Sequence, residues 1–228
     1  MMLPARKHRW IHLKFAGLAS LALAGALALS AKEKKADPAQ TARPVFAPRG
    51  GVFTSNVTLR LTAGTPANVI RYTLDGSEPD EASPAYTEPV ALTNSTLVRA
   101  RAFAPGQPPG QAVAEVFTLL DDDLRDFTSN LPLVIINTFG TNLVHERKIE
   151  TGLQLIDPGT GRARLSTPPN FSGPALLNIR GRASLRYPKS SFTVRVTNGE
   201  GEGEAVSLLG LPAESDWVLY AQIGRAHV

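Results

Sequence analysis

The sequence predicts a mainly β protein, and two observations lead to this fold class. The 228 residues include 18 Pro, 19 Gly and only 7% aromatic residues, a composition that favours short strands joined by many turns over a helical bundle. Several short segments alternate apolar and polar residues and are separated by turn-forming residues. There is no Cys, so hydrophobic cores rather than disulfides must hold the domains.

The first 31 residues are typical of a secretory signal peptide. Basic residues open the segment, an unbroken run of small and apolar residues fills 15–31, and Ala-x-Ala-like sites close it. The alternative is a retained membrane anchor, which the basic flank 32–35 would favour. We therefore expect a secreted or cell-envelope protein that meets a membrane only through this segment if it is left uncleaved.

The body of the chain is electrically neutral once this segment is set aside. Of the 24 Lys and Arg residues, four lie in residues 1–31, which leaves 20 basic residues against 20 acidic ones. A general nucleic-acid binder needs a surplus of positive charge, so we expect no nucleic-acid partner. Residues 32–43 are polar and lack an apolar pattern, which indicates a flexible linker.

Residues 44–119 are predicted to form an immunoglobulin-like β-sandwich. The stretches NVTLRLTA, VIRYTLD, TLVRARAF and AVAEVFTLL read as strands, and Arg-Gly-Gly, Asp-Gly and Pro-Gly turns separate them. About seven short strands in a segment of this length are typical of a small sandwich.

The same residues resemble the chitobiase/β-hexosaminidase C-terminal domain, a β-sandwich module found on secreted proteins. The resemblance rests on an aromatic strand, an Asp-Gly-Ser-x-Pro turn, a Tyr-x-x-Pro and an Ala-x-Ala pair. These residues are Arg71, Tyr72, Thr73, Asp75, Gly76, Ser77, Pro79, Tyr86, Pro89, Ala100 and Ala102. The resemblance implies an accessory module and no glycosidase activity. Asp75, Glu78, Asp80 and Glu81 leave a calcium loop as the alternative to a structural turn.

Residues 120–130 contain three consecutive aspartates and are predicted to be an acidic linker. Residues 131–222 then return to strand patterns. LPLVIINTF indicates a strand buried on both faces, and TGLQLIDPGTGRARL indicates two strands around a Pro-Gly turn. ALLNIRGRASL and SFTVRVTN predict two further strands, with GEGEG as a hairpin tip.

The order of motifs in this second segment resembles the N-terminal part of the spore-coat protein H (CotH) kinase family. The matching residues are Leu131-Pro132, Ile179-Arg180-Gly181, Ser184, Pro188-Lys189, Ser191-Phe192, Leu208-Leu209-Gly210-Leu211-Pro212 and Asp216-Trp217-Val218-Leu219. The resemblance implies the truncated N-terminal part of an α+β atypical kinase-like domain. It further implies that the full-length parent transfers phosphate from ATP, with a divalent metal such as Mg²⁺, to Ser of a protein substrate.

Three basic residues are the candidate nucleotide-binding residues. A kinase-like site needs a cation fixed on a strand beside the phosphates, and Lys189 immediately precedes a predicted strand and follows Pro188. Arg180 and Arg182 flank Gly181, and arginine binds phosphate in a bidentate manner. The alternatives are solvated strand ends and, for Arg180, a buried ion pair. Ser190 departs from the Pro-Lys-Lys that many relatives carry.

No catalytic residue and no metal ligand is assigned. The catalytic and metal-binding aspartates of the family lie in its C-terminal half, which we expect this fragment to lack, so it should be inactive and hold no cofactor itself. The last six residues, 223–228, break the preceding pattern and match the translation of a common sequencing adapter, which predicts a non-native tail. Two functions stay open: a fragment of an exported CotH-like protein kinase, or a non-catalytic cell-surface protein that contacts carbohydrate or protein through its sandwich.

Overall fold

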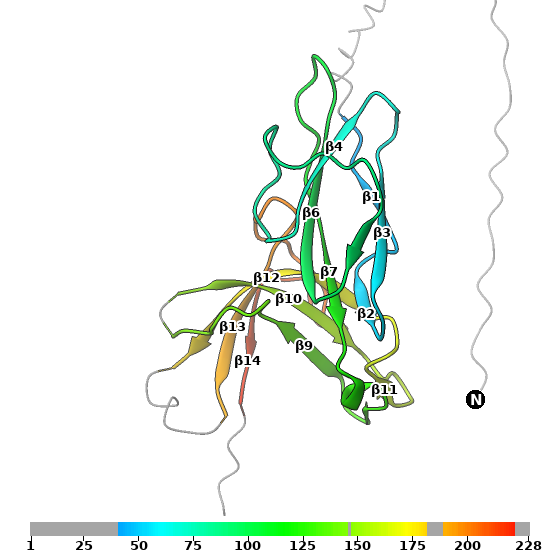
Figure 1. Cartoon of the computed structure of the whole chain (residues 1–228). Coiled ribbons are helices and arrows are strands. Elements are labelled where there is room, and N and C mark those ends of the chain that lie inside the picture. The colour runs from blue at the N-terminus through cyan, green and yellow to red at the C-terminus, as the bar shows by residue number, and fades with distance from the viewer. Residues whose placement is uncertain (1–40, 146, 182–188, 222–228) are drawn as a thin grey trace, which may run out of the picture. The chain divides into compact units, whose positions relative to one another are not determined.

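The computed structural model describes residues 41–145, 147–181 and 189–221, all of which lie in one compact unit spanning residues 37–228. In this part of the chain the regular structure is β-strand, apart from one short 3₁₀ turn, η1 (Asp122–Leu124) (Figure 1). The prediction of a mainly β protein is therefore confirmed. No α-helix of a kinase-like domain occurs among the described residues.

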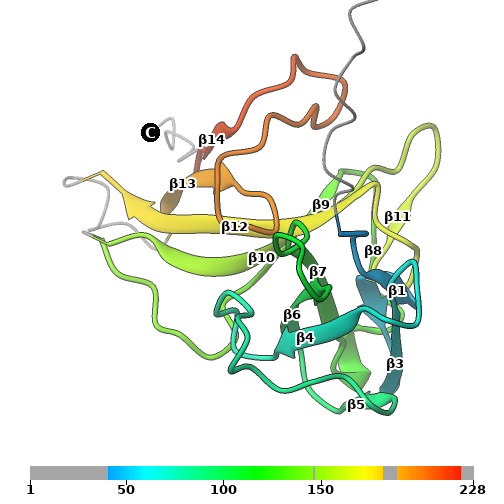
Figure 2. The same ribbon diagram turned by 90° about the horizontal axis from the view of Figure 1, so that it is seen from above.

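The first half is a two-layered β-sandwich (Figures 1 and 2). One sheet has the order β1-β3-β5 and the other the order β2-β7-β6-β4, in which β2 runs parallel to β7. The strands are β1 (Val45–Ala47), β2 (Gly51–Phe53), β3 (Val57–Thr62), β4 (Val69–Thr73), β5 (Val90–Leu92), β6 (Thr96–Phe103) and β7 (Val113–Leu119).

Alternation of side chains builds the sandwich core. In β3, Val57, Leu59 and Leu61 are buried while the residues between them are exposed, as the alternating sequence predicts. They pack against Val98 of β6 and Phe117 of β7, which come from the opposite sheet. Burying a side chain of this size contributes about 1.5–3 kcal/mol relative to leaving it in water, so this cluster is the main stabilising feature of the sandwich.

The Asp-Gly-Ser turn after β4 is held by its own hydrogen bonds. Oδ1 of Asp75 accepts from the backbone N–H of Ser77 at 3.0 Å and from its hydroxyl at 2.6 Å, and Gly76 has the positive φ of 80° that the turn needs. These bonds, first that of the Ser77 side chain, lower the pKa of Asp75. Among the described residues, no three carboxylates or imidazoles are grouped as a metal site would require.

Short paired segments connect the two halves. The three aspartates at 121–123 are exposed, but Leu120 beside them is buried against Ile156 and Leu165. η1 follows, and β8 (Thr128–Ser129) pairs with β11 (Ala163–Arg164). This joint is therefore anchored to both halves by an apolar cluster and a small two-stranded sheet.

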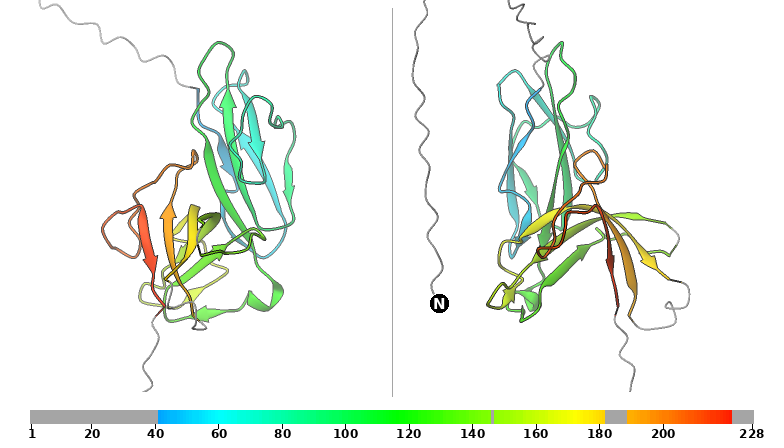
Figure 3. Two further views of the ribbon diagram at one scale, coloured as in Figure 1. Left: turned by 90° about the vertical axis from the view of Figure 1, so that its left-hand side faces the viewer. Right: turned by 180° about the vertical axis from the view of Figure 1, so that it is seen from behind.

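The second half is a five-stranded antiparallel sheet with the order β14-β13-β12-β10-β9 (Figure 3). Its strands are β9 (Leu133–Asn137), β10 (Ile149–Ile156), β12 (Phe171–Arg180), β13 (Ser191–Val196) and β14 (Asp216–Leu219). Ala175 and Leu177 are fully buried in one cluster with Val194 and Val196. The two strands predicted from ALLNIRGRASL and SFTVRVTN are thus confirmed as β12 and β13.

The prediction that residues 131–139 form a strand buried on both faces is wrong. Among the described strands, β9 lies at the edge of the sheet and pairs with β10 alone, and Val134 is 42% exposed. The strand is apolar because the side chains on its two faces pack against two different hydrophobic clusters. Ile136 packs against the core of the five-stranded sheet, while Leu133 and Ile135 pack against the cluster around Leu120.

Three close contacts fix β10 against the sandwich. A Cβ on Gly152 would lie 2.4 Å from Cγ1 of Val116, so only glycine lets β10 approach β7 this closely. Nε2 of the fully buried Gln154 donates to the carbonyl oxygen of Val116 at 3.2 Å. The buried Arg99 of β6 forms an ion pair with Glu150 of β10.

Burial raises the pKa of Glu150 more than the charge of Arg99 lowers it, and the nearby Asp75 carboxylate adds a smaller increase. The ion pair therefore compensates only part of the cost of placing this carboxylate between the two sheets.

Candidate functional site

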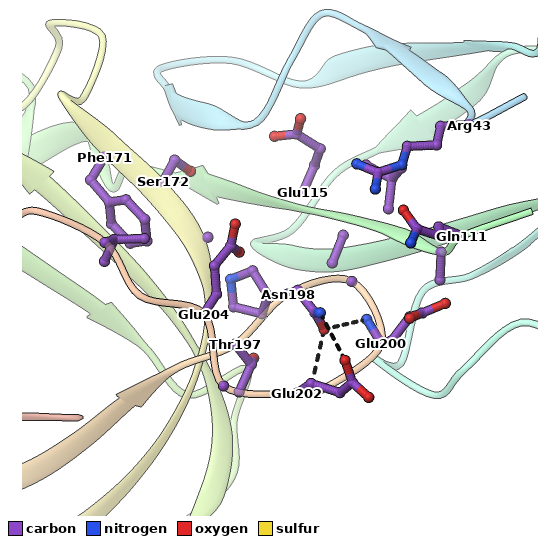
Figure 4. A pocket seen from close by; sticks show the side chains of 18 of the residues that line it. Arg43, Gln111, Glu115, Phe171, Ser172, Thr197, Asn198, Glu200, Glu202 and Glu204 are labelled. Carbon is purple, nitrogen blue, oxygen red and sulfur yellow. Dashed lines mark hydrogen bonds between the residues drawn. The ribbon is translucent and has the colours of Figure 1, made fainter. Parts of the chain in front are cut away.

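A polar cavity of about 630 Å³ lies beside β7, between the sandwich and the five-stranded sheet (Figure 4). This volume falls in the range of small-molecule binding sites. One wall comes from the residues before β1 and β2 and from the start of β7. The other wall comes from the start of β12 and from the hairpin that follows β13, residues 197–206.

The sandwich wall carries the hydrogen-bond donors of Arg43 and Gln111 and the buried carboxylate of Glu115. Arg43 is exposed and Gln111 is half-buried, and both line the cavity (Figure 4). Glu115 is only 7% exposed. Its carboxylate accepts from Nε of Arg49 at 3.3 Å and from the backbone N–H of Gly50 at 3.0 Å, so its charge is compensated inside the wall.

The hairpin wall is organised by one asparagine. Oδ1 of Asn198 accepts from the backbone N–H groups of Glu200 and Glu202 at 2.9 and 3.0 Å, and its Nδ2 donates to the Glu202 carboxylate at 3.4 Å (Figure 4). Gly201 has a φ of 77° at the tip. The segment GEGEG is thus a hairpin tip, as predicted, and its two glutamates and the following Glu204 are among the residues that line the cavity.

Gly199 sets the distance between the hairpin and β7. A Cβ at this position would lie 2.1 Å from the carbonyl oxygen of Ala112 and 2.9 Å from Cα of Val113. Both are backbone atoms, which cannot rotate away. The absence of a side chain at Gly199 therefore lets the hairpin rest on the strand and close that side of the cavity.

The carboxylates on the hairpin are partly compensated. Arg101 of β6, with a side chain only 16% exposed, lies 3.2 Å from Glu200 and 2.6 Å from Glu78. Glu204 is exposed on the cavity lining. The site thus offers donors on one wall, acceptors on the other and the ring of Phe171 at its edge.

Two of the three predicted nucleotide-binding residues, Arg180 and Lys189, lie away from this cavity at one end of the β12–β13 pair. Arg180 ends β12 and pairs in register with Ser191 of β13, two residues after Lys189. This register places Arg180 and Lys189 at the same end of the β12–β13 pair, and both side chains are exposed. Arg182 lies outside the described residues. Neither Arg180 nor Lys189 lines the cavity beside β7.

Asp216, one of the residues that carry the resemblance to the CotH kinase family, forms a bidentate ion pair with Arg195 at 2.8 and 2.7 Å. The bonds from Arg195 lower the pKa of Asp216. This pair joins β13 to β14 on the surface and leaves the carboxylate engaged by a structural partner.

Sequence reasoning does not find the cavity as a site. Arg43 falls in the predicted linker, Gln111 precedes a strand with no motif around it, and GEGEG predicts only a hairpin tip. The detectable signal was the combination of Asn198 with glycines on both sides of Glu200, which predicts a tight turn presenting carboxylates.

Comparison with known proteins identifies the sandwich alone. Residues 48–114 match the family model described as the chitobiase/beta-hexosaminidase C-terminal domain. The match runs from just before β2 into β7 and covers less than half of the chain. No curated protein and no solved structure matches the chain. No helix of the described residues is long and apolar enough to cross a membrane.

Proposed function

We propose that this protein is an exported, non-catalytic binding protein that contacts carbohydrate through the cavity beside β7. The observation that carries this proposal is the arrangement of the two walls. Arg43 and Gln111 present donors from the sandwich side, and Glu204 presents an acceptor from the hairpin. The sandwich side includes the end of the segment that matches the chitobiase/beta-hexosaminidase C-terminal domain.

The chemistry of a sugar suits such a cavity. Each hydroxyl both donates and accepts a hydrogen bond, so planar amide, guanidinium and carboxylate groups on opposite walls satisfy it from two sides. The ring of Phe171 offers an apolar surface for the C–H face of a pyranose. Because the hairpin is held by Asn198 and Gly199, the site is largely formed before a ligand arrives, which lowers the entropic cost of binding.

Calorimetric titration of the full chain with neutral, cationic and anionic hexasaccharides tests the proposal. Glucose, N-acetylglucosamine, glucosamine and galacturonate oligomers cover these classes. We expect Glu204→Ala to weaken binding at least about tenfold. Glu214→Ala, which removes the same charge from an exposed position outside the cavity, should leave it unchanged. Equal effects of the two variants, or no binding of any oligomer, would overturn the proposal.

The second candidate is that the chain is part of a CotH-like protein kinase whose full-length form transfers phosphate from ATP to Ser. The observation in its favour is that the resemblance residues meet on neighbouring strands. Ile179 of β12 pairs with Phe192 of β13, and Phe192 pairs with Leu219 of β14. A set of motifs scattered over the sequence thus converges on one sheet.

In this candidate, Lys189 and Arg180 would hold the nucleotide phosphates, and ATP with its divalent metal would supply the phosphoryl group. Thermal shift of a full-length protein with ATP and Mg²⁺ tests it. An increase in Tm that Lys189→Ala abolishes and Arg195→Ala retains would support the candidate. An unchanged Tm in the wild-type protein would remove it.

Export is proposed on the basic and apolar pattern of residues 1–31. N-terminal sequencing of the protein recovered from the medium or the envelope tests it. A mature terminus near residue 32 is expected, and recovery of the intact chain from the cytoplasm alone would refute export.

A further inference from the structure

A second hollow opens on the sandwich itself, at the end where β3 finishes and β4 begins. This hollow, the β3–β4 groove, has a volume of about 800 Å³. It is lined by the end of β3, the loop 63–68, the start of β4 and residues 85–87. The groove exists because β5 pairs with β3 only as far as Leu59, which leaves the last residues of β3 open on that side.

Among the residues that the structure describes, the lining of the β3–β4 groove contains no charged side chain. Its twelve lining residues are apolar, hydroxyl-bearing or amide side chains together with one glycine and one proline. A ligand that carried a charge would lose its water there without meeting a counter-charge, which is costly. The groove therefore selects an uncharged ligand, in contrast to the cavity beside β7 with its arginines and glutamates.

One aromatic ring in the groove is fixed in advance. Tyr86 packs edge-to-face against Tyr72, with ring centroids 6.3 Å apart and an interplanar angle of 78°. Its backbone N–H donates to the carbonyl oxygen of Ile70 at 2.8 Å. A ring held from both the side chain and the backbone offers a surface that a ligand does not have to order.

Polar groups suited to hydroxyls surround this ring. The Thr65 hydroxyl donates to Oδ1 of Asn68 at 3.1 Å, which turns the Nδ2 donors of that amide toward other acceptors. Thr62 and Thr87 are both exposed on the lining and bring two further hydroxyls. An aromatic ring with hydroxyl and amide groups but no charge matches the face and edge of a neutral pyranose.

We propose that the β3–β4 groove is a second binding site, for an uncharged sugar residue. The choice of sugar as the ligand class rests on the proposed function. One short segment of the chain contacts both sites. Arg43 lines the cavity, and the preceding residue, Ala42, lies beside Gly64 of the groove, where its Cβ is 2.7 Å from the position that a Cβ on Gly64 would take. A neutral polysaccharide held at both sites would gain affinity through effective concentration.

Titration of the full chain with the neutral hexasaccharides of glucose and N-acetylglucosamine tests this site. Thr62→Arg places a long charged side chain on the groove lining and should weaken binding at least about tenfold. Thr58→Arg is the matched control, because Thr58 lies exposed on the same strand but outside the lining. It should bind within about twofold of the wild-type protein. Asn68→Ala removes one donor without adding bulk and should weaken binding in the same direction.

The outcomes separate the two sites. If Glu204→Ala loses binding while Thr62→Arg and Asn68→Ala retain it, the groove is refuted and the cavity stands. The reverse pattern refutes the cavity and supports the groove. Binding of an uncharged Thr-Ser hexapeptide, displaced by no sugar, would also overturn the proposal, since the open end of β3 would then be pairing with a peptide strand.

Discussion

Replacement of Gly199 by alanine is the sharpest perturbation of the cavity beside β7. The added Cβ would stand 2.1 Å from the carbonyl oxygen of Ala112, well inside the 3.4 Å at which ordinary contact begins. Because the obstructing atoms belong to the backbone of Ala112 and Val113, where β7 begins, the hairpin must move away from the strand. Overpacking of this kind costs about 1–3 kcal/mol, and we place Gly199→Ala at the upper end because no side-chain rotation relieves it.

Gly203→Ala provides the matched control. Gly203 lies in the same hairpin, but its Cβ would meet Ser215 only at 3.5 Å, an ordinary contact. Chemical denaturation should show a loss of about 2–3 kcal/mol for Gly199→Ala and less than about 0.5 kcal/mol for Gly203→Ala. Sugar binding should weaken more in Gly199→Ala than in Gly203→Ala, although both glycines line the cavity. Equal stability of the two variants would refute the argument that close packing of this hairpin on β7 forms the site.

Three further predictions concern charged residues. Arg99→Ala should lower the free energy of unfolding by about 3 kcal/mol, the low end for a broken buried pair, because the Glu150 side chain is 32% exposed. Replacing the exposed Arg195 by alanine should cost little. Equal losses of the two variants in urea denaturation would contradict this prediction. The lowered pKa of Asp75 means that its carboxylate stabilises the fold above its ordinary pKa of about 4, and this contribution is lost as the pH falls through the lowered value. The stability difference between wild type and Asp75→Asn, followed by thermal melts, should therefore shrink on acidification, and a constant difference would refute the assignment. Lys189→Ala should leave sugar binding unchanged, and weaker binding in a titration would place this side chain at the carbohydrate site.

A strand of the sandwich could be predicted most directly where one of its faces is solvated. Alternation in β3 reports burial on one side and water on the other, and turn residues mark where the strand ends. β6 is different, because residues 97–100 are all buried and Arg99 on its second face meets Glu150 of β10. The Asp-Gly-Ser turn could be predicted for the same local reason, since Asp75 bonds within its own turn.

Features that depend on contacts between distant segments could not be predicted. β9 looks buried on both faces in sequence, yet it is an edge strand whose two faces touch separate clusters. Gly152 and Gly199 carry no sequence signal that distinguishes them from turn glycines, although each permits a backbone approach to β7. The cavity brings together Arg43, Gln111 and Glu204, which lie far apart along the chain. Only the folded arrangement reveals them as one site.

Amide chemical-shift mapping of the isotopically labelled full chain, titrated with a neutral hexasaccharide, is the most direct test of carbohydrate binding beside β7. We predict saturable amide shifts for residues 111–115, at the start of β7, and for residues 198–204 of the hairpin, while the amide of Lys189 does not shift. Saturable binding that leaves both of those segments unshifted would contradict the account.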